Sequence, residues 1–192
     1  MSEILERPQA PARRRFDIDA YYRMAEAGVL GDPRRVELID GEIIDLAAID
    51  SPHAEVTNRL ARLFSRALRD EAALVNVQSP LRFDAFNEPE PDVMILRPRA
   101  GGYRVSHPTA ADVLLLVEVS ETSLAYDRGV KLALYAKFGA QEVWIVDLLG
   151  GAVEVYREPK EVAYVSCERL ANGSLASALV SGVTIDVAGL VA

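Results

Sequence analysis

An almost unbroken apolar stretch, VLLLVEVS at residues 113–120, constrains the fold of this chain more than any other feature. A strand with one face in water alternates apolar and polar residues, whereas this stretch is apolar at both parities. It predicts a central strand covered on both faces, as in an α/β protein. Its five consecutive aliphatic residues, 113–117, fall far short of the roughly 20 that span a bilayer. We therefore expect no membrane segment.

Length and composition indicate one globular domain. The chain has 192 residues, of which 50% are apolar and 26% are charged, as in ordinary soluble proteins. Cys167 is the single cysteine, so no intrachain disulfide can form and a cytoplasmic location is expected. The N-terminus has a basic patch at 13–15 and no apolar core of a secretory signal. We expect a flexible arm at 1–15 and a single domain at 16–192.

The charge balance argues against a protein that coats nucleic acid nonspecifically. The chain has 29 acidic and 21 basic residues, a formal net charge of −8, and such coats depend on many contacts from lysine and arginine to phosphate. An enzyme that meets nucleic acid at one site is not excluded. Only three of the basic residues are lysine: Lys131, Lys137 and Lys160.

Periodicity and turn residues place further elements around the central strand. A helix is expected at 16–30 with Asp17 as its N-cap, and another begins at Ser51, which we expect to cap it. Asp40-Gly41 predicts a two-residue hairpin turn. The remaining expected elements are strands at 74–83, 92–96, 112–120 and 142–148, a helix at 127–138 ending at Gly139, and short strands at 153–157, 162–167 and 183–187 on the same sheet.

A basic stripe lies along the helix that begins at Ser51. Its members recur at helical spacing and are Arg59, Arg62, Arg66 and Arg69. The stripe is either a solvated helix face or a surface that faces phosphate.

Two carboxylates on neighbouring expected strands are candidate metal ligands. Glu118 lies near the end of the buried strand, where it needs a partner, a hydrogen bond or a metal to offset desolvation. Asp92 follows Pro91 at the start of another strand, which fixes the direction of its carboxylate. Two such groups can hold a hard divalent cation. The alternatives are a strand cap for Asp92 and a structural buried acid for Glu118.

Lys131 is the third candidate. Tyr135 and Phe138 follow it at i+4 and i+7, so Lys131 lies on a partly apolar face of the helix at 127–138. A lysine ammonium is a compact charge suited to positioning water beside a phosphate. The alternative is a lysine that extends along the surface to solvent.

Four segments of the sequence together resemble a known family. The segments RVELIDGEIIDL, SPHAEVTNRLARLF, EPDVMIL and LLLVEVSETSLAYDRGVKLALYAKFGAQEVWIVD, from 35 to 148, are similar to the Uma2 family, once called DUF820, of restriction-endonuclease-like proteins. The most specific part is a linked pattern: Glu118-Val119, Asp127, Lys131, Tyr135, Gly139 and Trp144.

The resemblance implies a PD-(D/E)xK nuclease core: a mixed central sheet flanked by helices, here with an added N-terminal hairpin and C-terminal strands. Asp92 and Glu118, with the carbonyl of Val119, would hold Mg²⁺, with Mn²⁺ as a substitute. Ser120 stands where the general pattern has lysine, and the implied replacement is Lys131. Glu37 resembles an upstream family acid, a further ligand or a neighbour of the ligands. His53 also matches a family position, and its ordinary interpretation is a helix-start group.

The leading hypothesis is metal-dependent hydrolysis of nucleic-acid phosphodiester bonds, with DNA as the expected substrate and a homodimer as the expected assembly. The alternative is an inactive nuclease fold that binds nucleic acid or a protein partner. A zinc hydrolase is disfavoured because the only histidines, His53 and His107, lack HExxH spacing. No phosphate-binding glycine loop is present, and Cys167 has the context of a packed apolar residue.

Overall fold

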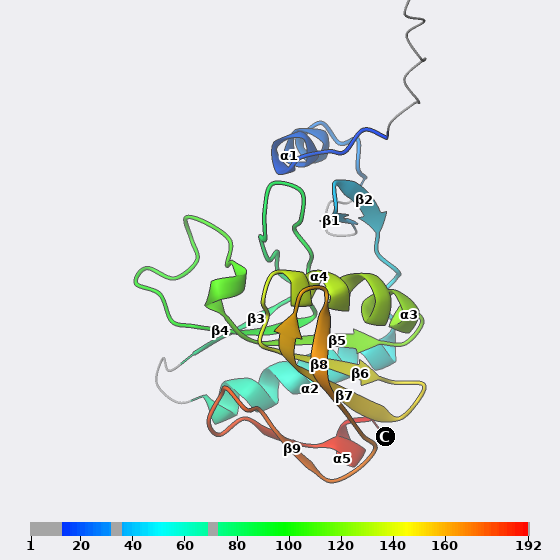
Figure 1. Cartoon of the computed structure of the whole chain (residues 1–192), viewed down its shortest axis with the longest axis vertical. Coiled ribbons are helices and arrows are strands. Elements are labelled where there is room, and N and C mark those ends of the chain that lie inside the picture. The colour runs from blue at the N-terminus through cyan, green and yellow to red at the C-terminus, as the bar shows by residue number, and fades with distance from the viewer. Residues whose placement is uncertain (1–12, 32–35, 69–72, 192) are drawn as a thin grey trace, which may run out of the picture.

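A six-stranded mixed sheet runs through the middle of the molecule (Figure 1). The computed structural model describes residues 13–31, 36–68 and 73–191. The strands lie in the order β3-β4-β5-β6-β7-β8, and of these pairs only β5–β6 is parallel. Their bounds are β3 (Leu74–Val77), β4 (Val93–Leu96), β5 (Val113–Ser120), β6 (Glu142–Asp147), β7 (Ala152–Lys160) and β8 (Ala163–Leu170).

The central strand is β5, and the expectation that both of its faces are covered is confirmed. On one face Leu115 and Val117 pack with Phe64 and Trp144 in a core that includes the helix at 51–67. On the other face Leu116 packs in a second core with the helical segment between β5 and β6. That segment is the crossover that a parallel strand pair requires, so the architecture is the expected α/β arrangement.

Helix α2 (Ser51–Ala67) covers the first of these faces. Its N-cap is Asp50 rather than Ser51, because the Asp50 side chain accepts a hydrogen bond from the backbone N–H of His53 at 3.0 Å. Arg59 donates to the backbone oxygen of Gly189 and Arg62 pairs with Glu55 at 3.2 Å. Two members of the predicted arginine stripe therefore have partners within the chain.

The other two members of the stripe are Arg66 and Arg69. Arg66 has no hydrogen-bond or ion-pair partner among the described residues, and Arg69 lies outside them.

The crossover between β5 and β6 is helical but not uniform. It consists of α3 (Leu124–Tyr126), the π-helical turn η3 (Asp127–Lys131) and α4 (Leu132–Lys137). The backbone N–H of Leu132 bonds to the oxygen of Asp127, five residues back. The segment ends as predicted at Gly139, whose φ of 79° favours glycine. It begins three residues earlier than expected.

The N-terminal hairpin forms as predicted. Strands β1 (Val36–Ile39) and β2 (Glu42–Asp45) pair antiparallel around Asp40 and Gly41, whose φ values are 51° and 75°. Both positive values match the primed turn that Asp-Gly favours. Arg13 pairs with Glu42 at 3.3 Å, and Arg15 pairs with Asp40, so these two residues of the expected arm contact the hairpin.

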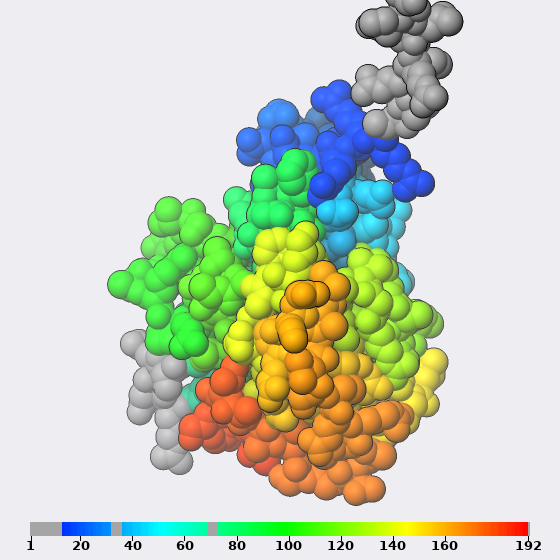
Figure 2. Space-filling model, in the orientation of Figure 1, coloured from blue at the N-terminus to red at the C-terminus, as the bar shows by residue number. Residues whose placement is uncertain are grey.

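Helix α1 (Ile18–Glu26) precedes the hairpin and has the predicted N-cap, Asp17, which accepts from Ala20 N–H at 2.8 Å. It ends four residues short of the expected 30. Figure 2 shows the N-terminal segments (blue) and the C-terminal segments (red) at opposite ends of the molecule.

Two expectations about strands are wrong. The strand expected over 74–83 ends at Val77, because Gln78 adopts a positive φ of 43° and Pro80 lacks the N–H that a strand ladder needs. The C-terminal pieces do not all join the main sheet. Strands β9 (Ser174–Ala176) and β10 (Thr184–Asp186) form a separate two-stranded sheet, followed by α5 (Val187–Val191).

These C-terminal elements instead extend the core beside α2, where Leu175, Ile185 and Leu190 are buried. The 3-10 turn η2 (Ala110–Asp112) leads into β5. Among the described residues, no helix is long and apolar enough to cross a membrane.

Candidate active site

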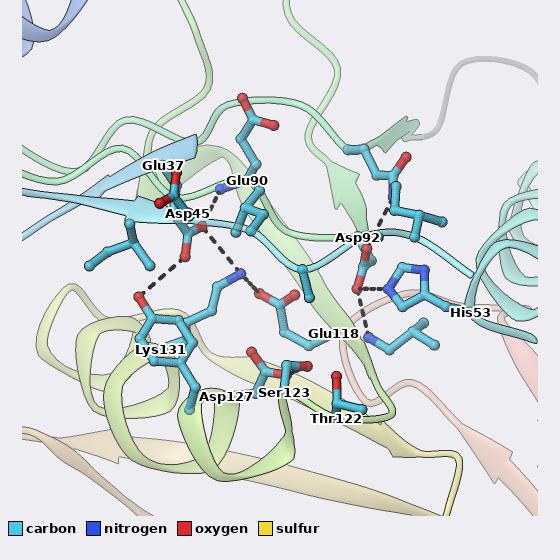
Figure 3. Close-up of a pocket in the computed structure, with 18 of the residues that line it drawn as sticks. Glu37, Asp45, His53, Glu90, Asp92, Glu118, Thr122, Ser123, Asp127 and Lys131 are labelled. Carbon is cyan, nitrogen blue, oxygen red and sulfur yellow. Dashed lines mark hydrogen bonds and ion pairs between the residues drawn. The ribbon is translucent and has the colours of Figure 1, made fainter. Parts of the chain in front are cut away.

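Four elements bring the predicted site residues to the walls of one cavity (Figure 3). Glu37 comes from β1 and Glu118 from β5, while Asp92 immediately precedes β4 and Lys131 ends the π-helical turn. The cavity has a volume of about 830 Å³. Residues up to 94 positions apart in sequence thus share a site that local patterns could only imply.

Glu118 and Lys131 form a buried ion pair. The Lys131 Nζ atom lies 2.8 Å from Glu118 Oε1 and 3.4 Å from Glu37 Oε2. Their exposed fractions are 3% for Glu118, 4% for Lys131 and 0% for Glu37. The Tyr135 hydroxyl also donates to Glu118 Oε1. Lys131, which the resemblance implies as the replacement for the triplet lysine, thus lies beside Glu118.

Burial and the neighbouring charges shift the pKa values of Glu118 and Lys131. Burial raises the pKa of Glu118 to about 8; Lys131 opposes this shift, while Asp127 and Asp92 add to it. Burial alone would lower the pKa of Lys131, but Glu118 and Glu37 raise it well above its ordinary value. Lys131 therefore stays protonated and acts as a fixed positive charge.

The raised pKa of Glu118 predicts a pH-dependent cost in stability. An acid whose folded pKa lies above its unfolded value stabilises the fold while protonated, and this contribution is lost as pH rises from about 4.5 toward 8. Glu118→Gln mimics the protonated acid and lacks this loss. Urea unfolding at pH 5 and pH 8 is expected to show wild type losing stability relative to Glu118→Gln; an unchanged difference would contradict the raised pKa.

Asp92 is held in place by three donors. Its Oδ2 atom accepts from the backbone N–H of Val119 at 2.8 Å and lies 3.1 Å from His53 Nε2, and its Oδ1 atom accepts from Gln78 Nε2 at 3.3 Å. The Val119 contact ties the start of β4 to the end of β5. Asp92 is thus oriented by its surroundings before any ligand arrives.

His53 has a second role beyond the helix start. Its backbone N–H completes the α2 cap, as that interpretation requires, but its ring also faces Asp92. Burial would lower the pKa of His53, yet hydrogen bonding and attraction to Asp92 raise it overall. The ring Nδ1 is buried without a hydrogen-bond partner. Sequence alone did not reveal this contact, because His53 and Asp92 are 39 residues apart.

Asp127 and Glu90 were not predicted as site residues. Asp127 is buried on the π-helical turn and accepts from Ser120 Oγ at 2.7 Å and Ser123 Oγ at 2.6 Å. The Glu90 backbone N–H donates to Glu37 Oε2 at 3.1 Å. Burial, together with Glu37, raises the pKa of Glu90 to about 7. The only sequence signal for Glu90 was its place in EPEPD, two residues before Asp92.

The donors fit a hard cation in kind. Carboxylate oxygens are the ligands that Mg²⁺ prefers, and Mg²⁺ usually keeps several waters rather than a full protein cage. Within the described ranges, no three His, Cys, Asp or Glu side chains are grouped so that they could hold a metal by themselves. Both Lys131 and Tyr135 bind Glu118 through Oε1, and Oε2 has no hydrogen-bond partner among the described residues. The set therefore suits an ion with one or two protein carboxylates.

A comparison with protein families identifies the family of this chain. The family model described as "Uma2: Putative restriction endonuclease" matches residues 18–188, which is most of the chain. The chain belongs to the Uma2 family.

A solved structure also resembles this Uma2 chain: the crystal structure of "a putative nuclease belonging to DUF820" from Anabaena variabilis, with a TM-score of 0.66. The alignment covers 81% of this chain and 89% of that one at 15% sequence identity, so the likeness concerns the fold. No curated protein matches the chain.

Proposed function

We propose that this Uma2 protein is a metal-dependent endonuclease that hydrolyses phosphodiester bonds of nucleic acid, with DNA as its substrate. The observation that carries the proposal is the buried Lys131 ammonium, 2.8 Å from Glu118 in a cavity that Asp92 also lines. An acid pair that can hold a divalent cation, beside a protonated lysine, can support phosphodiester hydrolysis. Membership of the family supports the same activity.

Asp92 and Glu118 would hold Mg²⁺, or Mn²⁺ in its place, with the Val119 carbonyl as a third oxygen. When bound, the ion would neutralise phosphate charge and lower the pKa of a bound water. Asp92 contributes a carboxylate already oriented by Val119 N–H and His53. Glu37 lies outside this pair and holds Lys131 from its other side.

Lys131 would act as a donor and a charge rather than as a base. Its raised pKa keeps it protonated, so it has no lone pair to accept a proton. An ammonium can orient a water by donating to it and can stabilise negative charge that develops on phosphate. A free lysine side chain samples many rotamers. The ion pair with Glu118 restricts Lys131 to one position in the cavity.

The test is a cleavage assay with labelled single-stranded and duplex oligonucleotides in Mg²⁺, in Mn²⁺ and in EDTA. Wild type is expected to cut only with a divalent cation. Asp92→Asn should lose cleavage, whereas Asp19→Asn, which removes an equal charge from an exposed site on α1, should keep it. Full Mg²⁺-dependent activity in Asp92→Asn would overturn the proposal.

A second candidate function is binding without cleavage. Ser120 in place of the triplet lysine favours it, as does the engagement of Lys131 by two carboxylates. Salt-sensitive oligonucleotide binding with no cleavage in either metal would establish this alternative. The proposal also includes a homodimer, which sedimentation of the full chain tests, and a location in the cytoplasm.

His53 is expected to be a positioning residue for Asp92. Replacing it with phenylalanine removes the contact at 3.1 Å and should lower metal affinity or activity about 10- to 100-fold, the usual effect of losing a group that orients a ligand. His53→Gln retains a donor and should recover part of the loss. A titration of activity against Mn²⁺ separates weakened metal binding from lost turnover; equal curves for wild type and His53→Phe would rule the role out.

A further inference from the structure

The cavity that holds the candidate active site extends well beyond it. Asp92 and Lys131 line one part, and α1, β2 and the segment 46–50 line the rest. Its volume of about 830 Å³ falls in the range of pockets for small organic molecules, roughly 300–1,000 Å³. The space suits a nucleotide or two. A base-paired duplex does not fit in a pocket of this size.

The charge of the lining also disfavours a continuous duplex backbone. Nine carboxylate residues line the cavity: Glu37, Asp45, Asp50, Glu88, Glu90, Asp92, Glu118, Glu121 and Asp127. The described lining contains no arginine, and its one lysine, Lys131, is already paired with two of these acids. Duplex DNA carries about one negative charge per 1.7 Å and is bound through many lysine and arginine contacts.

A nucleobase can interact favourably with this acidic lining, because it is neutral and carries N–H donors. Carboxylates accept hydrogen bonds from the exocyclic amino groups of bases. The Glu90 carboxylate has no hydrogen-bond or ion-pair partner among the described residues, and it points away from the Lys131–Glu118 pair (Figure 3). This acceptor is therefore available to a ligand in the outer part of the cavity.

The cavity lining also includes Tyr22, an aromatic side chain that is held in place through Glu88, two residues before Glu90. The Tyr22 hydroxyl donates to Glu88 Oε1 at 2.6 Å, and its ring meets the Tyr21 ring edge-on at 5.5 Å between centroids. The Arg82 guanidinium lies over one face of the ring, 5.7 Å from its centroid, so a base would stack on the opposite face. A fixed aromatic ring is the platform on which unpaired bases stack, whatever their sequence.

We propose that the outer part of the cavity, lined by Tyr22 and Glu90, binds an unpaired nucleobase next to the phosphate that is cut. The substrate is then a single strand, or a nucleotide flipped out of a duplex, rather than a continuous duplex. This inference rests on the proposed nuclease function for the site and names the class of substrate it accepts. One phosphate approaches Asp92 and Glu118 while the adjacent base occupies the outer part.

Binding of defined oligonucleotides tests the inference separately from cleavage. Fluorescein-labelled 20-mers of one sequence are compared as a single strand, a blunt duplex and a duplex with one unpaired base, by anisotropy with the full chain carrying Asp92→Asn. The single strand and the unpaired-base duplex are expected to bind at least about tenfold more tightly than the blunt duplex. Equal or tighter binding of the blunt duplex, or no binding of any oligonucleotide, would overturn the inference.

Variants locate the base in the cavity. Tyr22→Ala should weaken single-strand binding about tenfold, and Tyr22→Phe, which keeps the ring, should restore most of it. Tyr103→Ala is the matched control, because Tyr103 lies outside the cavity lining. Circular dichroism identifies any variant that fails to fold. Unchanged single-strand binding by a folded Tyr22→Ala, or by Tyr22→Leu if the alanine variant unfolds, would contradict the assignment.

Cleavage by wild type then separates the two proposals. Preferred binding of unpaired substrate with no cleavage in Mg²⁺ or Mn²⁺ would leave the base site standing and reject the nuclease activity. Metal-dependent cleavage of the blunt duplex at the same rate as the single strand would support the nuclease and reject the base site.

Discussion

Glu118→Gln is expected to lower the rate of Mg²⁺-dependent cleavage by about 10³-fold while the fold is retained. Glutamine has the shape of glutamate, and its Oε1 can still accept from Lys131 and Tyr135, as Glu118 does now. What it loses is the negative charge, and an amide is a poor ligand for Mg²⁺. The cleavage rate is measured in single-turnover reactions at fixed pH and metal concentration.

The control for this variant is Glu168→Gln, which makes the same chemical change on the exposed face of β8 and should cleave as wild type does. Circular dichroism should show native secondary structure in both proteins. If Glu118→Gln cleaves within threefold of wild type, Glu118 is not a metal ligand, and the acid pair would need a different second member.

Lys131→Met is expected to destabilise the protein by about 3–5 kcal/mol, the usual cost of removing one partner from a buried ion pair. The change leaves Glu118 and Glu37, with exposed fractions of 3% and 0%, without their cation. Methionine fills a similar volume, so a cavity contributes little. Urea unfolding followed by circular dichroism measures the free energy of unfolding.

A second substitution shows whether the cost is electrostatic. Lys131→Met combined with Glu118→Gln removes both charges of the closer pair, and we expect it to be more stable than Lys131→Met alone. Lys137→Met changes the exposed lysine of the same helix and should shift stability by less than about 0.5 kcal/mol. Wild-type stability in Lys131→Met would mean that Glu118 and Glu37 do not need the ammonium.

The parts of the fold that local chemistry dictates could be predicted from the sequence. The apolar residues 113–117 required burial on both faces, and Asp40-Gly41 required positive φ values, whatever the rest of the chain did. Lys131 could be placed beside the acids only through resemblance to a family, because the helix pattern alone fixes its face and not its partner.

Features set by distant segments could not be predicted in the same way. The contact between His53 and Asp92 depends on how α2 packs beside β4, and the Glu90 site depends on the hairpin that brings Glu37 to it. The π-helical turn at Asp127–Lys131 leaves no periodic signature in five residues. The strand expected at 183–187 forms as β10, but it pairs with β9, a strand that the sequence did not predict, and not with the main sheet.

The buried Trp144 gives this chain its own optical reporter. It is the only tryptophan in the sequence and has an exposed fraction of 0%. Its ring packs against Phe64 in the core beside α2, whereas the Tyr135 that binds Glu118 belongs to the core on the other face of the sheet. The emission maximum of Trp144 should therefore shift to the red when the domain unfolds. It should stay unchanged when Glu118 or Lys131 is substituted in a protein that remains folded.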